Sequence, residues 1–176
     1  GYYQSEYNLK NYLIKKIAFD DGSDNILFTD DDFVSFYAEG EYDFKYNLIK
    51  EIAFGEGSDN IWFTDDDVAG DYNEYEYDTD NNLIRELQFT THSEYNNYGS
   101  DNIWFTEDDI PDSYTKYEYD KNNNKVASHY LEQSENSLGN DKVWFTDDDY
   151  NNYDYQFNKS FEYNENNNLI TNIESS

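Results

Sequence analysis

The sequence predicts an all-β fold, an elongated, solenoid-like array of about five antiparallel β-hairpins joined by acidic loops that contain brief helical turns. Three observations predict it. An acidic phrase recurs along the chain, a second phrase alternates with it, and aromatic residues make up 20% of the sequence, with 20 Tyr and 12 Phe. Because a single hairpin is marginally stable in water, each hairpin is expected to bury its aromatic face against its neighbours.

The acidic phrase reads G-x-D-x-aliphatic-(W/L)-F-T-(D/E)-D-D and occurs four times. Its copies begin at Gly22, Gly57, Gly99 and Gly139, which places them 35, 42 and 40 residues apart. Such spacings are typical of repeat arrays. We therefore interpret residues 1–176 as one repeat domain. Its approximate units are 1–32, 33–67, 68–109, 110–149 and 150–176.

The second phrase, here called the hairpin phrase, reads Y-(D/N)-x-x-x-x-L-I-x-x-I-x-F. In its third copy aromatic and acidic residues alternate over 75–77, which favours a half-buried strand. Turn-forming Asp and Asn follow at 78–82, and a second strand is expected over 83–89. The pattern predicts similar hairpins over 117–131 and 161–173. The copies of the hairpin phrase begin at Tyr7, Tyr42, Tyr77, Tyr119 and Tyr163.

The hairpin phrase resembles the YD, or RHS, repeats of bacterial surface and secreted proteins, whose pattern is YDxxGNL. The match runs from Tyr77 to Leu83, and more loosely from Tyr119 to Lys125. The resemblance implies a stack of β-hairpins in a secreted or envelope protein and no catalytic residue. The usual glycine is replaced by Asn81, Asn123, Asn167 and, in the second copy, Tyr46. Asn can supply the left-handed conformation that this turn position requires.

The charge of the chain limits the kinds of partner that it can bind. With 40 acidic and 11 basic residues the formal net charge is −29, so the folded chain must tolerate strong self-repulsion that bound cations would relieve. Nucleic acid is a poor partner for such a surface, because phosphate backbones require Lys and Arg. No apolar run approaches the ~20 residues of a membrane span. The absence of Cys excludes thiolate metal sites.

The acidic phrases are the candidate metal sites. If the aromatic residues of each phrase pack on the hairpins, its acidic ends fold back together, where a hard cation would relieve their repulsion. Ca²⁺ is expected first, because it accepts six to eight oxygen ligands at roughly 2.3–2.6 Å, and Mg²⁺ second, because its geometry is stricter. The candidate ligands are Asp24, Asp31, Asp32, Asp59, Asp66, Asp67, Asp101, Asp108, Asp109, Asp141, Asp148 and Asp149.

A second interpretation of the acidic phrase needs no metal. Thr29 to Asp32 spells T-x-x-D, as do the corresponding residues of the other copies, and this pattern is similar to a helix capping box. Acidic residues in a first helical turn also suit the helix dipole. The two interpretations are compatible, since Thr could cap a turn while the carboxylates face an ion.

We expect a non-enzymatic, calcium-stabilised structural or adhesive module of a bacterial surface or secreted protein, located outside the cell or in its envelope. The alternative is a module that recognises a surface glycan or a protein without metal. Trp62, Trp104 and Trp144 share one repeat position at which Leu27 also stands, so we expect them to pack in the core. No nucleophile elbow, phosphate loop or dinucleotide motif indicates catalysis. The oligomeric state is left open.

Overall fold

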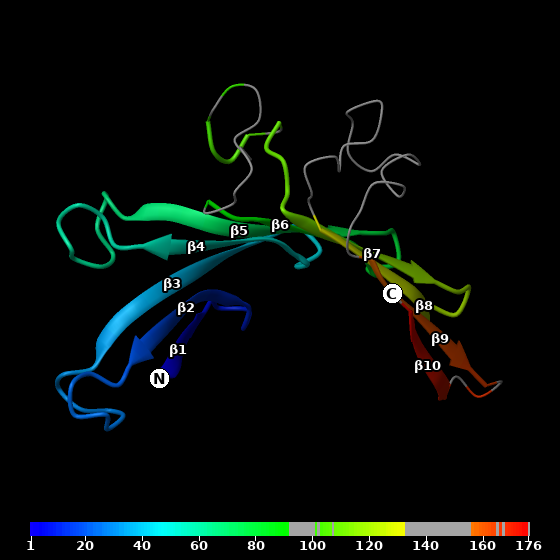
Figure 1. Ribbon diagram of the computed structural model, residues 1–176, viewed down its shortest axis with the longest axis horizontal. Coiled ribbons are helices and arrows are strands. Elements are labelled where there is room, and N and C mark those ends of the chain that lie inside the picture. Colours follow the sequence, from blue (N-terminus) through cyan, green and yellow to red (C-terminus); the bar gives the residue numbers. More distant parts are fainter. Residues whose placement is uncertain are drawn as a thin grey trace. The chain divides into compact units, whose positions relative to one another are not determined.

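The computed structural model describes residues 1–91, 101, 103–106, 108–132, 156–164, 166 and 168–175. These residues contain ten β-strands and no helix. Hydrogen-bonded neighbours follow the order of the sequence (Figure 1). The predicted all-β array of antiparallel hairpins is thus confirmed. The strands are β1 (Tyr2–Tyr7), β2 (Leu13–Asp20), β3 (Phe33–Tyr42), β4 (Leu48–Gly55), β5 (Val68–Tyr77), β6 (Leu83–Phe89), β7 (Ser113–Tyr119), β8 (Lys125–Glu132), β9 (Gln156–Tyr163) and β10 (Leu169–Ser175).

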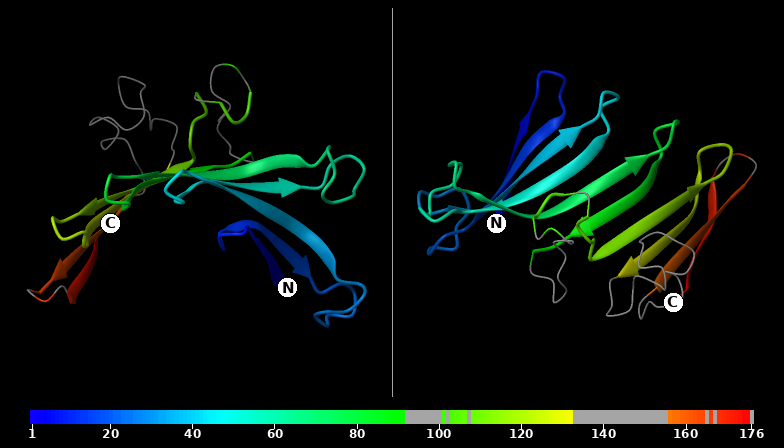
Figure 2. Two further views of the ribbon diagram at one scale, coloured as in Figure 1. Left: turned by 180° about the vertical axis from the view of Figure 1, so that it is seen from behind. Right: turned by 90° about the horizontal axis from the view of Figure 1, so that it is seen from above.

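The chain forms two compact parts, Gly1–Glu74 and Tyr75–Ser176. In the first part β1 to β4 lie side by side (Figure 2). Ile17 of β2 lies opposite Tyr37 of β3, which in turn lies opposite Phe54 of β4. Ile17 and Tyr37 are each 5% exposed, and the Tyr37 and Phe54 rings stack with their centroids 4.7 Å apart. This row of side chains forms the core of the first part.

The core of the second part uses the same repeat positions. Leu87 of β6 lies opposite Tyr114 of β7, which lies opposite Leu131 of β8. All three are buried, as is Phe89. The strand predicted over 83–89 is confirmed here, and along it Leu87 and Phe89 are buried whereas Gln88 between them is exposed.

The hairpin turns explain the Y-(D/N) pattern. Asp43 Oδ1 accepts hydrogen bonds from the backbone N–H groups of Lys45 (2.8 Å) and Asn47 (2.9 Å), so the carboxylate closes its own turn. The same bonds recur at Asn8, Asp78, Asp120 and Asn164. Four residues at the glycine position of the YD pattern adopt a left-handed φ of 61° to 69°: Asn11, Tyr46, Asn81 and Asn123.

The prediction that Asn supplies this conformation is therefore confirmed at Asn81 and Asn123, whereas Asn167 lies outside the described residues. Tyr46 adopts it as well, although its side chain makes the conformation costly. Its ring stacks on Tyr12 with centroids 4.7 Å apart, and Lys10 Nζ lies 4.1 Å from the ring centroid. These contacts offset part of the cost.

In three copies of the hairpin phrase, the tyrosine that opens the phrase binds the preceding hairpin. The Tyr119 hydroxyl donates a hydrogen bond to the Leu83 carbonyl oxygen (2.9 Å), and Tyr163 donates to the Lys125 carbonyl oxygen (3.0 Å). Tyr42 donates to Leu13 in the same way. Burial raises the pKa of Tyr42 and of Tyr119, as expected for phenols held between strands.

Among the described residues, no helix is long and apolar enough to cross a membrane.

Candidate functional site

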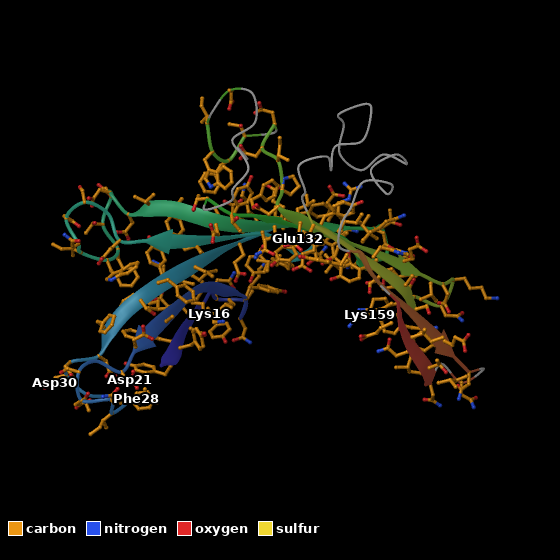
Figure 3. All side chains as sticks on the ribbon, viewed as in Figure 1. Lys16, Asp21, Phe28, Asp30, Glu132 and Lys159 are labelled. Atoms are coloured by element: carbon orange, nitrogen blue, oxygen red, sulfur yellow. The ribbon has the colours of Figure 1, made fainter. Side chains whose placement is uncertain are left out.

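The acidic phrases that the structure describes lie in the loops that join successive hairpins. The first phrase occupies residues 22–32 between β2 and β3, and the second occupies 57–67 between β4 and β5. In the first part of the chain these loops lie at the strand ends opposite the hairpin turns (Figure 1). Asp30 and Phe28 of the first phrase project from such a loop in Figure 3. The third phrase is described in part, and the fourth, with Asp141, Asp148, Asp149 and Trp144, lies outside the described residues.

In the three phrases that the structure describes in full or in part, the penultimate carboxylate joins the two ends of the loop. Asp31 Oδ2 accepts hydrogen bonds from the Ser23 backbone N–H (2.7 Å), the Ser23 hydroxyl (2.8 Å) and the Asp24 N–H (3.2 Å). These bonds stabilise the charged form, so the pKa of Asp31 falls to about 2. The equivalent bonds join Asp66 to Ser58 and Asp59, and Asp108 to Asp101.

Glycine at the start of the phrase is required by this closure. A Cβ atom at Gly57 would lie 2.2 Å from the Asp66 carbonyl oxygen, and one at Gly22 would lie 2.5 Å from the Asp31 carbonyl oxygen. Both distances are far below van der Waals contact. Gly22 also has a φ of +57°, a conformation that other residues seldom adopt.

The threonine lies at the centre of the closed loop. In the second phrase Thr64 Oγ1 lies 2.7 Å from Asp66 Oδ1 and 3.0 Å from the Ile61 carbonyl oxygen. Hydrogen bonds from Thr64 and Ser58 lower the pKa of Asp66 to about 2. The first aspartate closes a smaller turn, since Asp59 Oδ1 accepts a hydrogen bond from the Ile61 N–H (2.8 Å). The first and third phrases repeat these contacts.

The last aspartate holds a phenylalanine in an unusual backbone conformation. Oδ2 of Asp32, Asp67 and Asp109 accepts a hydrogen bond from the N–H of the phenylalanine four residues earlier, at 2.7 Å in each case. The phenylalanines have φ values of 66° to 70°, which are strained for a bulky residue. They are Phe28, Phe63 and Phe105.

This arrangement corrects the expectation of brief helical turns. In the described phrases the Thr carbonyl accepts one hydrogen bond from the last Asp N–H, at 3.2 to 3.3 Å, and no helix follows. One half of a capping box is present in the third phrase, where Thr106 N–H donates to Asp109 Oδ2 (3.1 Å). The left-handed phenylalanine immediately before the threonine sets the direction in which the chain enters this turn.

The strained phenylalanine packs on a strand tyrosine. The Phe63 and Tyr37 ring centroids are 4.9 Å apart, and the Trp62 ring meets Tyr37 edge-on at 6.1 Å. In the first phrase the Phe28 and Tyr2 centroids are 4.3 Å apart. Trp104 contacts Phe89 at 6.4 Å. Trp62 and Trp104 were expected to pack in the core; they are half-buried and contact strand aromatic residues, and neither belongs to the buried core.

Charged groups border the aromatic cluster of the second phrase. Lys15 Nζ lies 4.5 Å from the Tyr37 ring centroid and 4.7 Å from that of Phe63, and it pairs with Glu39 at 2.9 Å. Burial raises the pKa of Tyr37, and the nearby Asp67 carboxylate raises it further. Asp67 Oδ1 is itself buried, and no hydrogen bond of ordinary geometry reaches it.

The candidate metal ligands are thus brought together in part. Within each described phrase the first and penultimate aspartates approach the same threonine hydroxyl, while the last aspartate binds the phenylalanine N–H. Across the described part of the chain, no group of three or more His, Cys, Asp or Glu side chains is arranged to hold a metal ion. The carboxylates instead accept hydrogen bonds from the loop that carries them.

Two participants were not identified from the sequence. One is the serine after the first glycine, Ser23 or Ser58, which binds the penultimate aspartate. The other is the strand tyrosine on which the phrase packs, Tyr2 or Tyr37. Tyr2, Tyr37 and Tyr72 are 35 residues apart, the same spacing as the first two acidic phrases, and this shared period was the available signal.

Comparison with known proteins gives a limited result. No family model matches the chain, and no curated protein matches it. Among solved structures, the chain is similar to one in the crystal structure of TcdB2-TccC3-Cdc42, with 14% sequence identity and a TM-score of 0.46. The match covers 98% of this chain and 8% of that chain, so the present chain spans less than a tenth of that protein's length.

Proposed function

We propose that this chain is a non-enzymatic structural module of a bacterial surface or secreted protein, built from YD-like hairpin repeats. The observation that supports the proposal is that two kinds of contact, one at each end of the strands, hold described hairpins in place. At one end of the strands a tyrosine hydroxyl binds the preceding hairpin. At the other end an acidic phrase folds back onto a strand tyrosine.

The chemistry of the acidic phrase supports a structural role. Its glycine permits close approach of the loop ends, its serine and threonine bind the carboxylates, and its aromatic residues pack on the hairpins. All of these contacts join residues of the same chain, as expected for groups that stabilise the fold. A carboxylate with a pKa of about 2 is also poorly suited to general acid or base chemistry near neutral pH.

Calcium dependence is the finer part of the proposal. The net charge of −29 favours cation uptake, and Asp67 Oδ1 offers a buried anionic oxygen at the base of the second phrase. A cation bound there would also have to recruit Asp59 or Asp66 from their present hydrogen bonds. A site filled to about 100 times its dissociation constant would add about 2.7 kcal/mol to the free energy of unfolding.

Thermal melts of the full chain and of Asp66→Asn/Asp67→Asn, in EGTA and in millimolar CaCl₂ at matched ionic strength, test both parts. The structural part expects the double variant to melt earlier than the native chain in EGTA, because loop closure is weakened. The calcium part expects CaCl₂ to raise the melting temperature of the native chain more than MgCl₂ does, with a smaller rise in the variant.

The structural role of the acidic phrases and the calcium dependence can be contradicted separately. If the double variant has the same melting temperature as the native chain in EGTA, the acidic phrases do not fasten the hairpins. If the native chain has the same melting temperature in EGTA and in CaCl₂, calcium dependence is rejected. The test of the structural role, made in EGTA alone, is unaffected. Calorimetric titration with CaCl₂ provides the stoichiometry, which should fall by about one site in the double variant.

A further inference from the structure

Two hairpin turns of the first part project apolar side chains into solvent. Leu9 lies in the turn between β1 and β2, and Phe44 holds the same repeat position between β3 and β4. Leu9 is fully exposed and Phe44 is 87% exposed, the two highest values among the large hydrophobic residues of the described ranges. Hydrogen-bonded strands flank the β3–β4 hairpin on both sides, so the exposure of Phe44 does not result from an open sheet edge.

The tips of these two turns are positively charged. Lys10 and Lys45 come directly after the two apolar residues, and both are exposed. Within the turn segments 7–12 and 42–47, Asp43 is the one acidic residue, and its carboxylate closes its own turn through backbone N–H groups. The tips therefore carry a net positive charge on a chain whose formal total is −29.

Two tyrosines lie directly behind the tips. The Tyr12 and Tyr46 rings stack with centroids 4.7 Å apart, which places the two turns side by side (Figure 2). Lys10 Nζ lies 4.1 Å from the centroid of the Tyr46 ring. Tyr46 adopts a left-handed φ of 69° at a position where the other copies of the hairpin phrase carry Asn. A tyrosine kept at this conformational cost indicates a use for its ring beyond the turn itself.

The acidic phrases lie too far from the tips to cancel their charge. Each acidic phrase of the first part carries four acidic residues and no basic residue. The ten residues of β3 separate the first phrase from the tip that carries Phe44 by roughly 33 Å. Charges are screened over about 8 Å at physiological ionic strength. Nearer the tips, Glu6 lies opposite Lys15, and Glu41 lies opposite Lys50.

We propose that the tips of these two hairpin turns bind the surface of an anionic phospholipid bilayer. Leu9 and Phe44 enter the boundary between headgroups and acyl chains, where apolar side chains of interfacial proteins are buried. The lysines that follow them contact lipid phosphates. The stacked tyrosines behind the tips occupy the headgroup region, which favours tyrosine. This membrane contact is independent of the structural role proposed above and of calcium.

A bilayer fits these tips better than a protein partner does. A stable protein interface covers roughly 800 Å² on each partner, whereas the tips offer two apolar side chains that project from narrow turns. A bilayer needs no matching groove, because lipid surrounds each inserted side chain. The third and fourth copies of the hairpin phrase carry Thr79 and Lys121 in place of the apolar residue, so the contact belongs to the first part.

Co-sedimentation of the full chain with large unilamellar vesicles tests the proposal. Vesicles of phosphatidylcholine mixed with phosphatidylglycerol are compared with phosphatidylcholine alone at physiological salt. EGTA is present throughout, so that calcium cannot bridge the acidic phrases to lipid phosphates. We expect reversible binding to the mixed vesicles, half-saturated at lipid concentrations on the order of millimolar, and weaker binding to phosphatidylcholine. A chain that stays in the supernatant with millimolar mixed vesicles overturns the proposal in favour of a protein partner. Equal binding to both kinds of vesicle also overturns it.

Serine variants locate the contact. Phe44→Ser should reduce the affinity for mixed vesicles roughly tenfold or more, because the burial of one phenylalanine side chain is lost. Ile61→Ser is the matched control, since Ile61 is 58% exposed in the second acidic phrase, at the other end of the strands. Both side chains are exposed, so thermal melts should show both variants folded. Equal losses of affinity would contradict the assigned contact.

Lysine variants test the role of charge. Lys45→Gln should weaken binding to mixed vesicles about fivefold and leave binding to phosphatidylcholine unchanged. Lys121→Gln removes the same charge from a turn tip without an apolar residue, so it should leave both affinities unchanged. If the two variants weaken binding equally, the net charge of the chain governs the association and the assigned site is wrong.

Discussion

The first and second acidic phrases have the same sequence pattern and the same closure, yet they differ in packing. In both, the penultimate aspartate binds the serine near the start of the phrase, and the last aspartate binds a left-handed phenylalanine. Phe28 is nevertheless 74% exposed, whereas Phe63 is 46% exposed. Loop closure is therefore local to the phrase, and aromatic burial depends on something outside it.

The neighbouring hairpin accounts for the difference. The second phrase packs on Tyr37 of β3, and β2 lies beside that strand and contributes Lys15 over both rings. The first phrase packs on Tyr2 of β1, whose outer edge has no such strand among the described residues. Trp62 in place of Leu27 adds further ring contact in the second phrase. In the second phrase, the preceding hairpin thus contributes to the aromatic cluster through Lys15.

The largest expected effect is a difference in stability loss between variants of the two aromatic clusters, around Tyr37 and around Tyr2. Tyr37→Ala removes a buried ring that contacts Phe54, Trp62 and Phe63, so it should lower the free energy of unfolding by about 3–4 kcal/mol. Tyr2→Ala should cost about 1 kcal/mol, because that ring is half-exposed. Urea unfolding measures both variants. Equal losses would show that the preceding hairpin contributes nothing to the cluster.

An intermediate effect tests whether closure is the same in both phrases. Gly57→Ala and Gly22→Ala should each cost about 1–3 kcal/mol, because a Cβ atom would collide with the backbone of the penultimate aspartate. Gly55→Ala is the matched control, since nothing lies within 4 Å of its Cβ position. Thermal melts compare the variants, and a tolerated alanine at either tested site would contradict the close approach described for that phrase.

The smallest expected effect concerns pH. The folded pKa of Asp31 and of Asp66 is about 2, below the ordinary value of 3.8. Their contribution to stability is therefore complete above pH 4 and is lost as the pH falls toward 2. Because both carboxylates are exposed to solvent, water screens the effect.

The matched comparison is Asp31→Asn/Asp66→Asn against the native chain, melted at intervals from pH 5 to pH 2. The gap in melting temperature between them should narrow over the lower half of that range. As the pH falls, the other acidic residues become protonated and charge repulsion decreases in both proteins. The difference between the two melting temperatures removes this shared effect. A gap that stays constant down to pH 2 would show that these two carboxylates are not stabilised in their charged form.

The hairpins could be predicted from the sequence because the signals that specify them are local. Asp78 binds the backbone two and four residues ahead, and Asn81 adopts the left-handed conformation, so the phrase contains the information for its own turn. Buried Leu87 and Phe89 follow the two-residue period of a strand. The packing of Trp62 was predictable for a similar reason, since Leu27 stands at the same repeat position.

The organisation of the acidic phrase was harder to predict because it depends on geometry across the loop. Asp66 reaches Ser58 eight residues away only once Gly57 has allowed the loop ends to meet. Clustered carboxylates in the sequence predict a bound cation. The backbone N–H groups that bind these carboxylates in the structure leave no mark in the sequence. The left-handed phenylalanine has no sequence signature, since glycine or asparagine would be expected there. Tyr37 is 26 residues from Phe63, and only pairing of β3 with β4 brings them together.

The junctions between hairpins tolerate connections of unequal length. Ile17 and Tyr37 are paired across a separation of 20 residues, and Leu87 and Tyr114 hold the equivalent positions across 27. The seven additional residues leave the strand register unchanged. Foreign peptides grafted between β6 and β7 should therefore be accommodated without disturbing the sheet, which makes this connection a natural position for displaying an epitope or a label.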